Sequence, residues 1–371
     1  MEGHKFWDTQ LVSNKDRRTI VKLEDSLEFV GDSPAQLPEG FVWDTIDIKD
    51  SVEELYKFLN ENYVEGDLYK FKYTKEFLSW ALGSPKASVS WNVCVRVKSS
   101  NKLIGFVSGI PMELNLGKFV WITFLCVHKK LRSKRLAPVL IHEVSRRIVV
   151  EKIIYAIFTA GSIFSTPVSE TRYHHRFLNP LKLVEIGFCK PTGKMTTSRL
   201  IKLNKLPDKP ITEGFRLIKS EDVGQIRQIL NNYLEKLAIS INFSEEEVFH
   251  WFYQNSIVKA YVVEKFGKIT DFGSFYITED EVVSSSKHKI LRVGHMFYTV
   301  STQTPLTQFV KDLLIMASTF QVDVFNSLDV MNYREFFEEL RFTTGTGTLN
   351  YYLFNYSHPT IPREQMGVLM F

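Results

Sequence analysis

The stretch Phe124-Leu-Cys-Val-His-Lys-Lys-Leu-Arg-Ser-Lys-Arg-Leu-Ala-Pro138 largely decides how this chain folds and what it binds. It begins in an apolar strand, predicted over residues 119–127, and ends in a helix predicted over 136–150. The helix is indicated by apolar residues at helical spacing, namely Leu136, Val139, Leu140, Val144 and Ile148. Pro138 falls in the first helical turn, where a missing N–H is tolerated.

The loop between this strand and this helix predicts an anion site. It carries five cations, which are Lys129, Lys130, Arg132, Lys134 and Arg135. The first N–H groups of a helix have no internal partner, and the helix dipole is positive there. A pyrophosphate is the most natural ligand for such a site. Charge alone also allows a solvated basic loop, but the order strand, basic loop, helix favours a phosphate-bearing cofactor.

The composition of the chain limits the classes of protein to which it can belong. A chain of 371 residues, 44% hydrophobic and 24% charged, predicts a soluble globular protein of one large or two medium domains. The net charge of +4 argues against nucleic-acid binding as the main role. Cys94, Cys126 and Cys189 form neither a disulfide framework nor a metal spacing, so no metal is expected. Neither a signal peptide nor a membrane span is recognised, which predicts a cytoplasmic protein; whether residues precede Met1 stays open.

The chain shows the same order of elements twice. A strand after Gly40 or Gly214 precedes a helix over 50–63 or 220–233. Three strands follow each helix, at 89–97, 103–114 and 119–127 in the first half and at 258–263, 272–277 and 291–300 in the second. A further helix (136–150; 305–320) and strand (153–159; 322–328) complete each half. The pattern predicts an α/β fold with a mixed sheet in two pseudo-symmetric halves, 1–203 and 204–371, joined by a linker at 203–210. Chance similarity of two α/β halves is the alternative.

The two halves differ at the loop before the later helix. In the second half this loop reads Ser301-Thr-Gln-Thr-Pro305 and has no cation. If the first half holds a phosphate-bearing cofactor, we expect the second half to hold something else.

Ten sequence blocks give the chain a family resemblance. They are Lys5-Phe-Trp-Asp-Thr-Gln10, Glu61-Asn-Tyr-Val-Glu65, Phe124 to Pro138, Thr159-Ala-Gly161, Arg172-Tyr-His-His-Arg176, Leu178-Asn-Pro180, His250-Trp-Phe-Tyr253, Thr302-Gln-Thr-Pro305, Asp323-Val-Phe-Asn326 and Leu349-Asn-Tyr-Tyr-Leu353. In this order they resemble the eukaryotic glycylpeptide N-myristoyltransferases over nearly the whole chain. The segment from Arg132 to Ala137 is also similar to the acyl-CoA loop of GNAT acyltransferases, Arg/Gln-x-x-Gly-x-Gly/Ala, and departs from it at Arg135.

The resemblance implies a fold and a reaction. The fold would be two GNAT-like halves around a continuous saddle-shaped sheet, the first binding myristoyl-CoA and the second binding the peptide. The reaction would be transfer of the myristoyl group to the amine of an N-terminal glycine. Backbone N–H groups of Phe124 and Leu125 would form the oxyanion hole, and Thr159 would hydrogen-bond the amine. The amine must lose a proton, and the implied general base is the terminal carboxylate of Phe371, although sequence alone favours a frayed terminus.

The resemblance also assigns the binding residues. Contacts to myristoyl-CoA would come from Lys5, Phe6, Trp7, Phe124, Leu125, Cys126, Val127, Ser133, Arg135, Leu136 and Ala137. Contacts to the peptide would come from Tyr63, Val64, Phe71, Tyr73, Gly161, Tyr173, His175, Ser274, Tyr298, Asn326 and Leu349. Aromatic residues at such spacings are also typical of a packed core, and His174 with His175 could form a surface pair. The expected partners are nascent proteins beginning with glycine; ribosome association stays open, and a monomer without nucleic acid or a membrane span is expected.

Three departures from the family pattern bear on specificity. Thr123 stands where the family usually has Asn, and Thr346 stands in Gly345-Thr346-Gly347 where it usually has Asp. The acidic run after Glu65 is thinned to Gly66-Asp67-Leu68. We therefore predict a weaker preference for Lys or Arg downstream of the substrate glycine. The rival interpretations are a GNAT-type acetyltransferase, a non-catalytic acyl-CoA-binding protein and a basic-surface interaction module.

Overall fold

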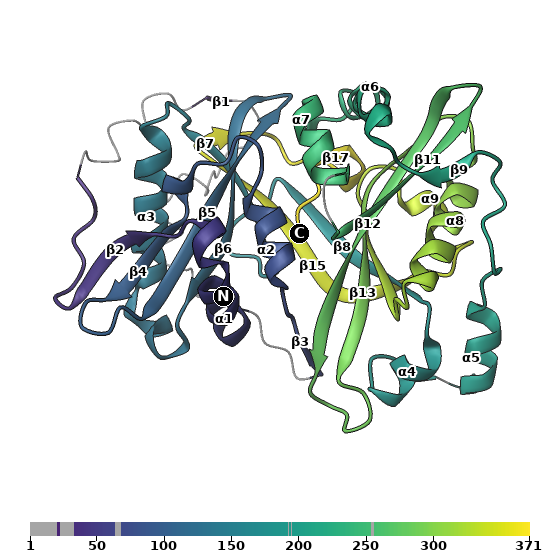
Figure 1. The fold of residues 1–371 in the computed structure, drawn as a ribbon, viewed down its shortest axis with the longest axis horizontal. Coiled ribbons are helices and arrows are strands. Elements are labelled where there is room, and N and C mark those ends of the chain that lie inside the picture. The colour runs from purple at the N-terminus through teal and green to yellow at the C-terminus, as the bar shows by residue number, and fades with distance from the viewer. Residues whose placement is uncertain (1–20, 23–32, 64–67, 192, 194, 254–255) are drawn as a thin grey trace. The chain divides into compact units, whose positions relative to one another are not determined.

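The computed structural model describes residues 21–22, 33–63, 68–191, 193, 195–253 and 256–371 (Figure 1). The chain forms two compact units. The first consists of Met1–Val64, Phe77–Glu170 and Thr348–Pro362, and the second of Glu65–Glu76, Thr171–Gly347 and Arg363–Phe371. The two units therefore differ from the two halves expected from a single division at residue 203. Each unit combines three segments that are separated along the chain by segments of the other unit.

The first unit is built on a mixed sheet. Its strands follow the order β2 (Phe41–Thr45), β4 (Val93–Val97), β5 (Leu103–Leu114), β6 (Gly117–Val127), β7 (Tyr155–Ala160) and the later part of β15 (Thr343–Phe354). The pair β6–β7 is parallel, whereas the pairs β2–β4, β4–β5, β5–β6 and β7–β15 are antiparallel. The short strand β1 (Val21–Lys22) pairs with β16 (Tyr356–Ser357).

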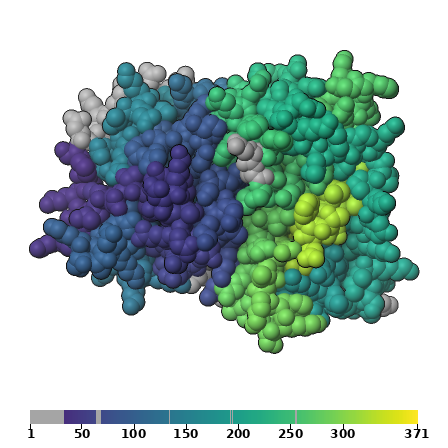
Figure 2. All heavy atoms as spheres, viewed as in Figure 1, coloured from purple at the N-terminus to yellow at the C-terminus, as the bar shows by residue number. Residues whose placement is uncertain are grey.

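Helices cover both faces of this sheet (Figure 1). Helix α3 (Leu136–Val149) contributes Leu140 to an apolar cluster that includes Val95 of β4. The next residue on β4, Arg96, points to the other face, because side chains alternate along a strand. Its guanidinium binds Glu54 of α1 (Ile48–Asn62) at 2.6 Å. The outer face of α1 is polar and lies at the surface (purple in Figure 2).

The core of the first unit confirms the predicted amphipathic helix. Leu140, Val144 and Ile148 are buried in one cluster with valines of β4, β5 and β6. Burial of such side chains stabilises the fold by about 1.5–3 kcal/mol each. The strand predicted over 89–97 is wrong at its start, because Val89–Trp91 forms a 3₁₀ turn (η3) closed by a hydrogen bond from Trp91 N–H to the Ser88 carbonyl. Helix α2 (Lys75–Leu82) adds further buried apolar residues.

The second unit is likewise built from parallel and antiparallel strands. Their order is β15, β8 (Ser169–Phe177), β14 (Val324–Leu328), β13 (Ile290–Ser301), β12 (Lys268–Val282), β11 (Val258–Lys265) and β9 (Phe215–Leu217), and β3 (Tyr69–Lys70) pairs with β12. The pair β13–β14 is parallel. Strand β10 (Ile239–Ser240) pairs in parallel with β17 (Met366–Gly367). The tip of the β12–β13 hairpin is exposed (green in Figure 2).

The helices of the second unit are α4 (Pro180–Glu185), α5 (Thr197–Asn204), α6 (Val223–Leu234), α7 (Glu245–Val248), α8 (Leu306–Thr319) and α9 (Arg334–Phe337), with a π-helical turn at Phe249–Tyr253. Two of them, α6 and α8, match the helices predicted over 220–233 and 305–320, and the other helices were not predicted. Helix α6 begins after a 3₁₀ turn, Ser220–Asp222. The series β4-β5-β6-α3-β7 thus recurs as β11-β12-β13-α8-β14, which confirms the repeated order of elements. In the part of the chain described, no helix is long and apolar enough to cross a membrane.

Candidate active site

Strand β6 carries a β-bulge at its C-terminal end. Phe106 of β5 pairs with Cys126, whereas Ser108 pairs with Thr123, so Phe124 and Leu125 together oppose one residue. Phe124 has a φ of 52°, in the left-handed region that a bulky side chain rarely adopts. A bulge interrupts the regular ladder and re-aims the groups around it, which is why bulges are common at active sites. The two residues expected to form the oxyanion hole are therefore the two residues of the bulge.

The basic loop follows directly. Residues Lys129–Lys134 form a 3₁₀ turn, η4, and all five predicted cations are exposed. The end of α1 holds the loop in place through Asn62, which is buried. The side-chain Oδ1 of Asn62 accepts a hydrogen bond from Lys129 N–H at 3.1 Å, and its main-chain carbonyl accepts one from the Arg132 guanidinium. Arg135 has a φ of 57° and starts α3 without a side-chain cap. The loop thus presents positive charge at an open helix N-terminus.

The corresponding loop of the second unit is already filled by a carboxylate. Asp271 is fully buried, and its Oδ1 accepts hydrogen bonds from the N–H groups of Thr302, Gln303 and Thr304 before α8. The hydroxyls of Ser301 and Thr304 also donate to it, at 2.7 and 2.8 Å. Burial acts to raise the pKa of Asp271, but these hydrogen bonds outweigh it and lower the pKa. The loop before α8 thus binds a carboxylate of the chain itself, whereas the basic loop before α3 presents cations.

The bulge itself recurs in the second unit. Gly273 of β12 pairs with Thr299 and Phe275 pairs with Met296, so Phe297 and Tyr298 oppose Ser274 alone. The duplicated strands thus share the same irregularity. In the second unit, however, Ser274 and Tyr298 are buried, and the Ser274 hydroxyl donates to the Tyr298 carbonyl.

Several expected residues of the first unit gather around its bulge. The ring of Tyr63 lies 5.9 Å from that of Phe124. Burial, with a smaller effect of the Cys126 thiol, raises the pKa of Tyr63 to about 12. Burial likewise raises the pKa of Cys126 to about 12, so the thiol is protonated at neutral pH. Cys126 is therefore a packing residue of the strand rather than a thiolate nucleophile.

The other expected residues of the first unit lie along β7 and β15. Thr159 is half-buried and stands opposite Tyr351 in the β7–β15 pair. Gly161 follows β7, and its carbonyl accepts a hydrogen bond from the Thr348 hydroxyl at 3.2 Å. Leu349 is half-buried on the neighbouring strand. Away from these strands, Val127 of β6 is a buried member of the apolar cluster, and Leu136 and Ala137 of α3 are partly buried and pack against it.

The C-terminal segment is anchored in the second unit. β17 pairs with β10, and Val368, Leu369 and Met370 are buried. The Leu369 N–H donates to the hydroxyl oxygen of Tyr298 at 2.9 Å, and the ring of Phe371 lies 5.9 Å from that of Trp251. The frayed terminus favoured by sequence alone is thus wrong, because four apolar residues and a buried tyrosine hold the segment. Tyr298 is 1% exposed and supports this segment.

A polar row crosses four strands of the second sheet. Tyr276 of β12 stands opposite His295 of β13, His295 opposite Asn326 of β14, and Asn326 opposite His175 of β8. The His175 Nδ1 and Asn326 Oδ1 atoms are 2.7 Å apart, and the rings of Tyr276 and His295 stack at 4.7 Å. Burial, and then the nearby His175, lowers the pKa of His295 to about 3, and burial also lowers the pKa of His175. Both rings are neutral at neutral pH.

Aromatic residues surround this row. Phe71 contacts both Tyr73, at 5.1 Å between ring centroids, and His295, at 6.3 Å. Burial raises the pKa of Tyr173 to about 12. His174 points away from His175: its ring stacks on Phe337 at 4.3 Å and its Nε2 lies 3.7 Å from Asp329. The surface His pair considered from the sequence is therefore wrong.

Sequence reasoning missed three residues of this face: Tyr276, His295 and Asp280. The strand was predicted to end at residue 277, whereas β12 continues to Val282. Polar residues alternate with apolar ones at 274, 276 and 278, which was a signal for Tyr276, but residues 278–281 are all polar and gave no such signal for Asp280.

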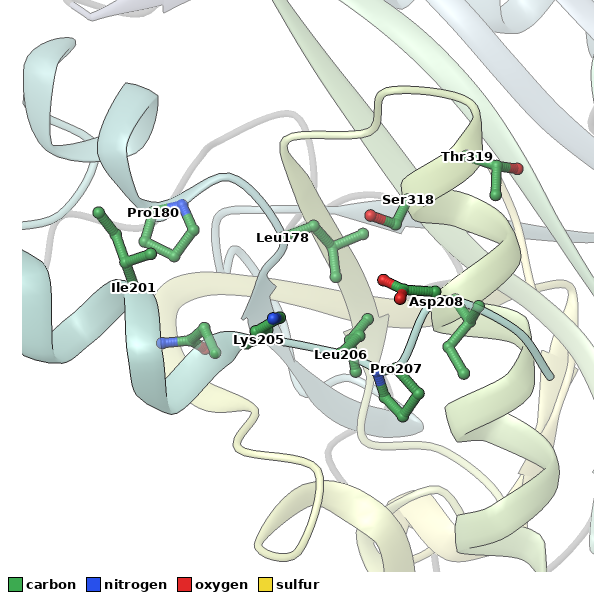
Figure 3. Close-up of a pocket in the computed structure, with 11 residues that line it drawn as sticks. Leu178, Pro180, Ile201, Lys205, Leu206, Pro207, Asp208, Ser318 and Thr319 are labelled. Atoms are coloured by element: carbon green, nitrogen blue, oxygen red, sulfur yellow. The ribbon is translucent and has the colours of Figure 1, made fainter. Parts of the chain in front are cut away.

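Other features lie outside these clusters. A pocket of about 380 Å³ in the second unit contains no expected site residue (Figure 3). It is lined by Leu178, Pro180, Ile201, Asn204, Lys205, Leu206, Pro207, Asp208, Ile315, Ser318 and Thr319. Within the described ranges, no group of His, Cys, Asp or Glu side chains could hold a metal ion. Lys5, Phe6, Trp7, Val64 and the thinned acidic Gly66-Asp67 lie outside the described residues, as does the side chain of Ser133.

Two family models match the chain. The N-terminal domain of myristoyl-CoA:protein N-myristoyltransferase matches residues 20–171, and the C-terminal domain of the same enzyme matches residues 185–367. The chain belongs to the myristoyl-CoA:protein N-myristoyltransferase family. It is therefore an acyltransferase, as the sequence resemblance implied.

Relatives from distant organisms support the N-myristoyltransferase assignment. Glycylpeptide N-tetradecanoyltransferase 2 of Bos taurus is 43% identical over 99% of this chain and 76% of its own length. The Plasmodium falciparum enzyme is 37% identical over 99% of this chain and 93% of its own. A crystal structure of Saccharomyces cerevisiae N-myristoyltransferase with bound myristoyl-CoA is 36% identical, with a TM-score of 0.94 over 99% of this chain and 95% of that one. This match confirms the expected mixed α/β fold.

Proposed function

We propose that this N-myristoyltransferase transfers the myristoyl group from myristoyl-CoA to the N-terminal glycine amine of proteins by direct attack of the amine on the thioester. The attack forms a C–N bond and an oxyanion, and collapse of this intermediate breaks the C–S bond and releases CoA. The amine proton goes to the terminal carboxylate of Phe371. The single observation that carries this proposal is the bulge at Phe124 and Leu125, immediately before a basic loop and a helix N-terminus.

The backbone N–H groups of Phe124 and Leu125 act as the oxyanion hole. A fixed donor of this kind typically contributes about 3–4 kcal/mol to the transition state. The left-handed backbone at Phe124 supports the proposal, because such conformations persist where a site requires them. Thr159 hydrogen-bonds the incoming amine.

The carboxylate of Phe371 is the general base. Support comes from the anchored segment, which is held by Tyr298 and by the β10–β17 pair. The amide donors belong to the first unit and the carboxylate belongs to the second.

Myristoyl-CoA is the acyl donor and is bound mainly by the first unit. Its phosphates would meet the basic loop and the start of α3, through Ser133, Arg135, Leu136 and Ala137, with Cys126 and Val127 beside the pantetheine or acyl chain. The N-terminal residues Lys5, Phe6 and Trp7 would cover it. Burial of roughly a dozen methylenes at about 0.8 kcal/mol each accounts for selection of a long acyl chain.

The peptide is bound mainly by the second unit, along the face that holds Phe71, Tyr73, Tyr173, His175 and Asn326. Their gathering around one polar row supports this assignment. Ser274 and Tyr298 are buried in the same unit, and Tyr63, Val64, Gly161 and Leu349 would complete the contacts. A monomer that acts on nascent chains in the cytoplasm, near the ribosome, fits this chemistry.

The test is acyl transfer from myristoyl-CoA to a synthetic peptide that begins with glycine. Acetyl-CoA and a chain with one residue added after Phe371 are run in parallel. Rapid myristoylation that the extension abolishes, with myristoyl-CoA binding intact, is expected. Activity that survives the extension would move the base elsewhere, and a preference for acetyl-CoA would overturn the assignment of the donor.

A further inference from the structure

Strand β12 buries a carboxyl group that nothing in the reaction described above uses. Asp280 is 1% exposed and stands opposite Leu291 of β13. Leu291 and the neighbouring Val282 belong to an apolar cluster with Leu183 and Val324. The carboxyl group therefore lies at the border between this apolar cluster and the polar row of Tyr276 and His295.

The partners of Asp280 are few. The backbone N–H of Lys72, which follows β3, hydrogen-bonds the carboxylate. Oδ1 has no hydrogen-bond partner among the residues that the structure describes. The ammonium of the same Lys72 is bound instead to Glu281 at 3.0 Å, and Glu281 points to the other face of the strand.

Such an arrangement is unfavourable in the unliganded protein. Burial raises the pKa of Asp280 to about 7, against the smaller opposite effect of the Lys72 N–H. A buried charge without a partner destabilises a fold, and chains retain such groups mainly where a function uses them. A donor group supplied by a ligand would complete the hydrogen bonding of this buried, unpartnered oxygen.

The position of Asp280 on β12 indicates which ligand would supply this donor group. Side chains of β12 alternate, so Tyr276, Thr278 and Asp280 share one face, and His295 binds Thr278 on this same face at 3.1 Å. This is the face that the proposed function assigns to the peptide. Elsewhere on the second unit, Gly345-Thr346-Gly347 lies in β15, where Thr346 is exposed and offers no carboxylate.

We propose that Asp280 determines peptide specificity by binding a cationic side chain, Lys or Arg, downstream of the acceptor glycine. The inference rests on the proposed function, because it requires the peptide to lie along this face. An ammonium or guanidinium group would supply the missing donors to Oδ1 and keep the carboxylate ionised. The weaker preference predicted from Thr346 is a separate prediction, because it concerns a carboxylate that residue 346 does not supply, whereas Asp280 supplies one on β12.

The experiment measures kcat/KM for a set of glycine peptides in which Lys replaces Ala at one position at a time. Wild type is compared with Asp280→Asn, and Glu281→Gln on the opposite face is the matched control. At one position, wild type and Glu281→Gln should favour Lys over Ala about tenfold or more, and Asp280→Asn should reduce this ratio to about twofold or less. The Ala peptide should be modified at similar rates by all three proteins.

Thermal unfolding separates specificity from folding. Asp280→Asn should unfold at a temperature no lower than wild type, because it removes an uncompensated buried carboxyl. A Lys preference that persists in Asp280→Asn, or an equal loss of activity toward Lys and Ala peptides, would overturn the inference while leaving the transferase activity established. Absence of transfer to every glycine peptide would overturn the proposed function and this inference with it.

Discussion

At the scale of single residues, Gly345 shows how closely the polar row is packed. A Cβ atom at this position would collide with the Nε2 and Cδ2 atoms of His175. Gly345→Ala should therefore displace the imidazole and break its hydrogen bond with Asn326. We expect a loss of about 1–3 kcal/mol in the free energy of unfolding and a raised KM for the peptide.

Gly347→Ala is the control for this prediction. A Cβ there would meet only the Tyr173 ring, at 3.3 Å, so the neighbour needs to move by a few tenths of an ångström. Urea unfolding of both variants measures the difference. Equal effects of the two substitutions would show that the His175 contact is not the cause.

His295 should make stability depend on pH. Its pKa is about 3 in the folded protein and near 6.5 when unfolded, so between these values the unfolded chain binds the proton and the folded chain does not. Its stabilising contribution is thus complete above pH 6.5 and is lost as the pH falls toward 3, with a slope approaching about 1.4 kcal/mol per pH unit.

His295→Gln removes the titrating group and keeps a hydrogen-bonding side chain beside Thr278. Unfolding free energies measured from pH 7 to pH 4 should fall less steeply for this variant than for wild type. Asp280 acts with the opposite sign, since its raised pKa makes the folded state lose stability as the pH rises toward 7. Parallel curves for the two proteins would contradict the assignment to His295.

At the scale of elements, the start of α3 explains a departure seen in the sequence. Arg135 occupies the position where acyl-CoA loops usually have glycine, and its φ of 57° is the conformation that glycine adopts without steric cost. Arg135→Gly should therefore be more stable to unfolding than Arg135→Ala by about 1 kcal/mol.

Comparing Arg135→Gly with Arg135→Ala separates the effect of backbone conformation on stability from the effect of the lost charge on myristoyl-CoA binding. Both remove one exposed cation, so both should raise KM for myristoyl-CoA by a similar, salt-dependent factor. Stability comes from chemical denaturation and KM from steady-state transfer. If only one of them raised KM, the guanidinium would not be the group that attracts the phosphates.

The sequence predicted those elements that depend on local periodicity. Strand β6, helix α3 and the repeated series in the second half were all read from apolar spacing, and Pro138 lies in the first turn of α3 as expected. It did not predict the bulge at Phe124, because a bulge depends on the register between two strands. It also missed Asp271, whose hydrogen bonds to the loop before α8 appear only when β12 and that loop meet in space.

At the scale of the whole molecule, Arg363 ties the end of the chain to the body of the second unit. Its Nη1 lies 2.5 Å from the buried carboxylate of Asp329, which also accepts the Arg172 N–H. Burial acts to raise the pKa of Asp329, and His174, Arg172 and Arg363 outweigh it and lower the pKa. Arg363→Ala should destabilise the protein by about 1–2 kcal/mol.

If Phe371 is the base, this substitution should also lower kcat while leaving KM for myristoyl-CoA unchanged. Glu364→Gln is the matched control in the adjacent position. Glu364 and Arg334 are exposed and 3.6 Å apart, and such pairs contribute about 0–1 kcal/mol. If Arg363→Ala is destabilised but keeps a normal kcat, the ion pair between Arg363 and Asp329 stabilises the fold without contributing to catalysis.

The family and its fold were predictable from the ordered blocks, but the assignment of residues to units was not. Periodicity locates elements along the chain and does not reveal that Tyr69 pairs with β12 or that residues 348–362 belong with the first unit. The anchored C-terminus could not be derived from its four apolar residues alone, because the same four residues would also be compatible with a frayed tail. Its burial depends on Tyr298 and β10, which lie far away in sequence.

Strand β15 has a consequence for how the protein matures. Its residues Asn350–Phe354 pair with β7, which the chain completes nearly two hundred residues earlier. During synthesis from the N-terminus, β7 must therefore wait with one edge unsatisfied until almost the entire polypeptide has been made. Long-range pairing of this kind slows folding and exposes strand edges to aggregation. The strands of the first unit are incompletely paired without Asn350–Phe354, so a chain that stops before these residues should be insoluble rather than a functional first half.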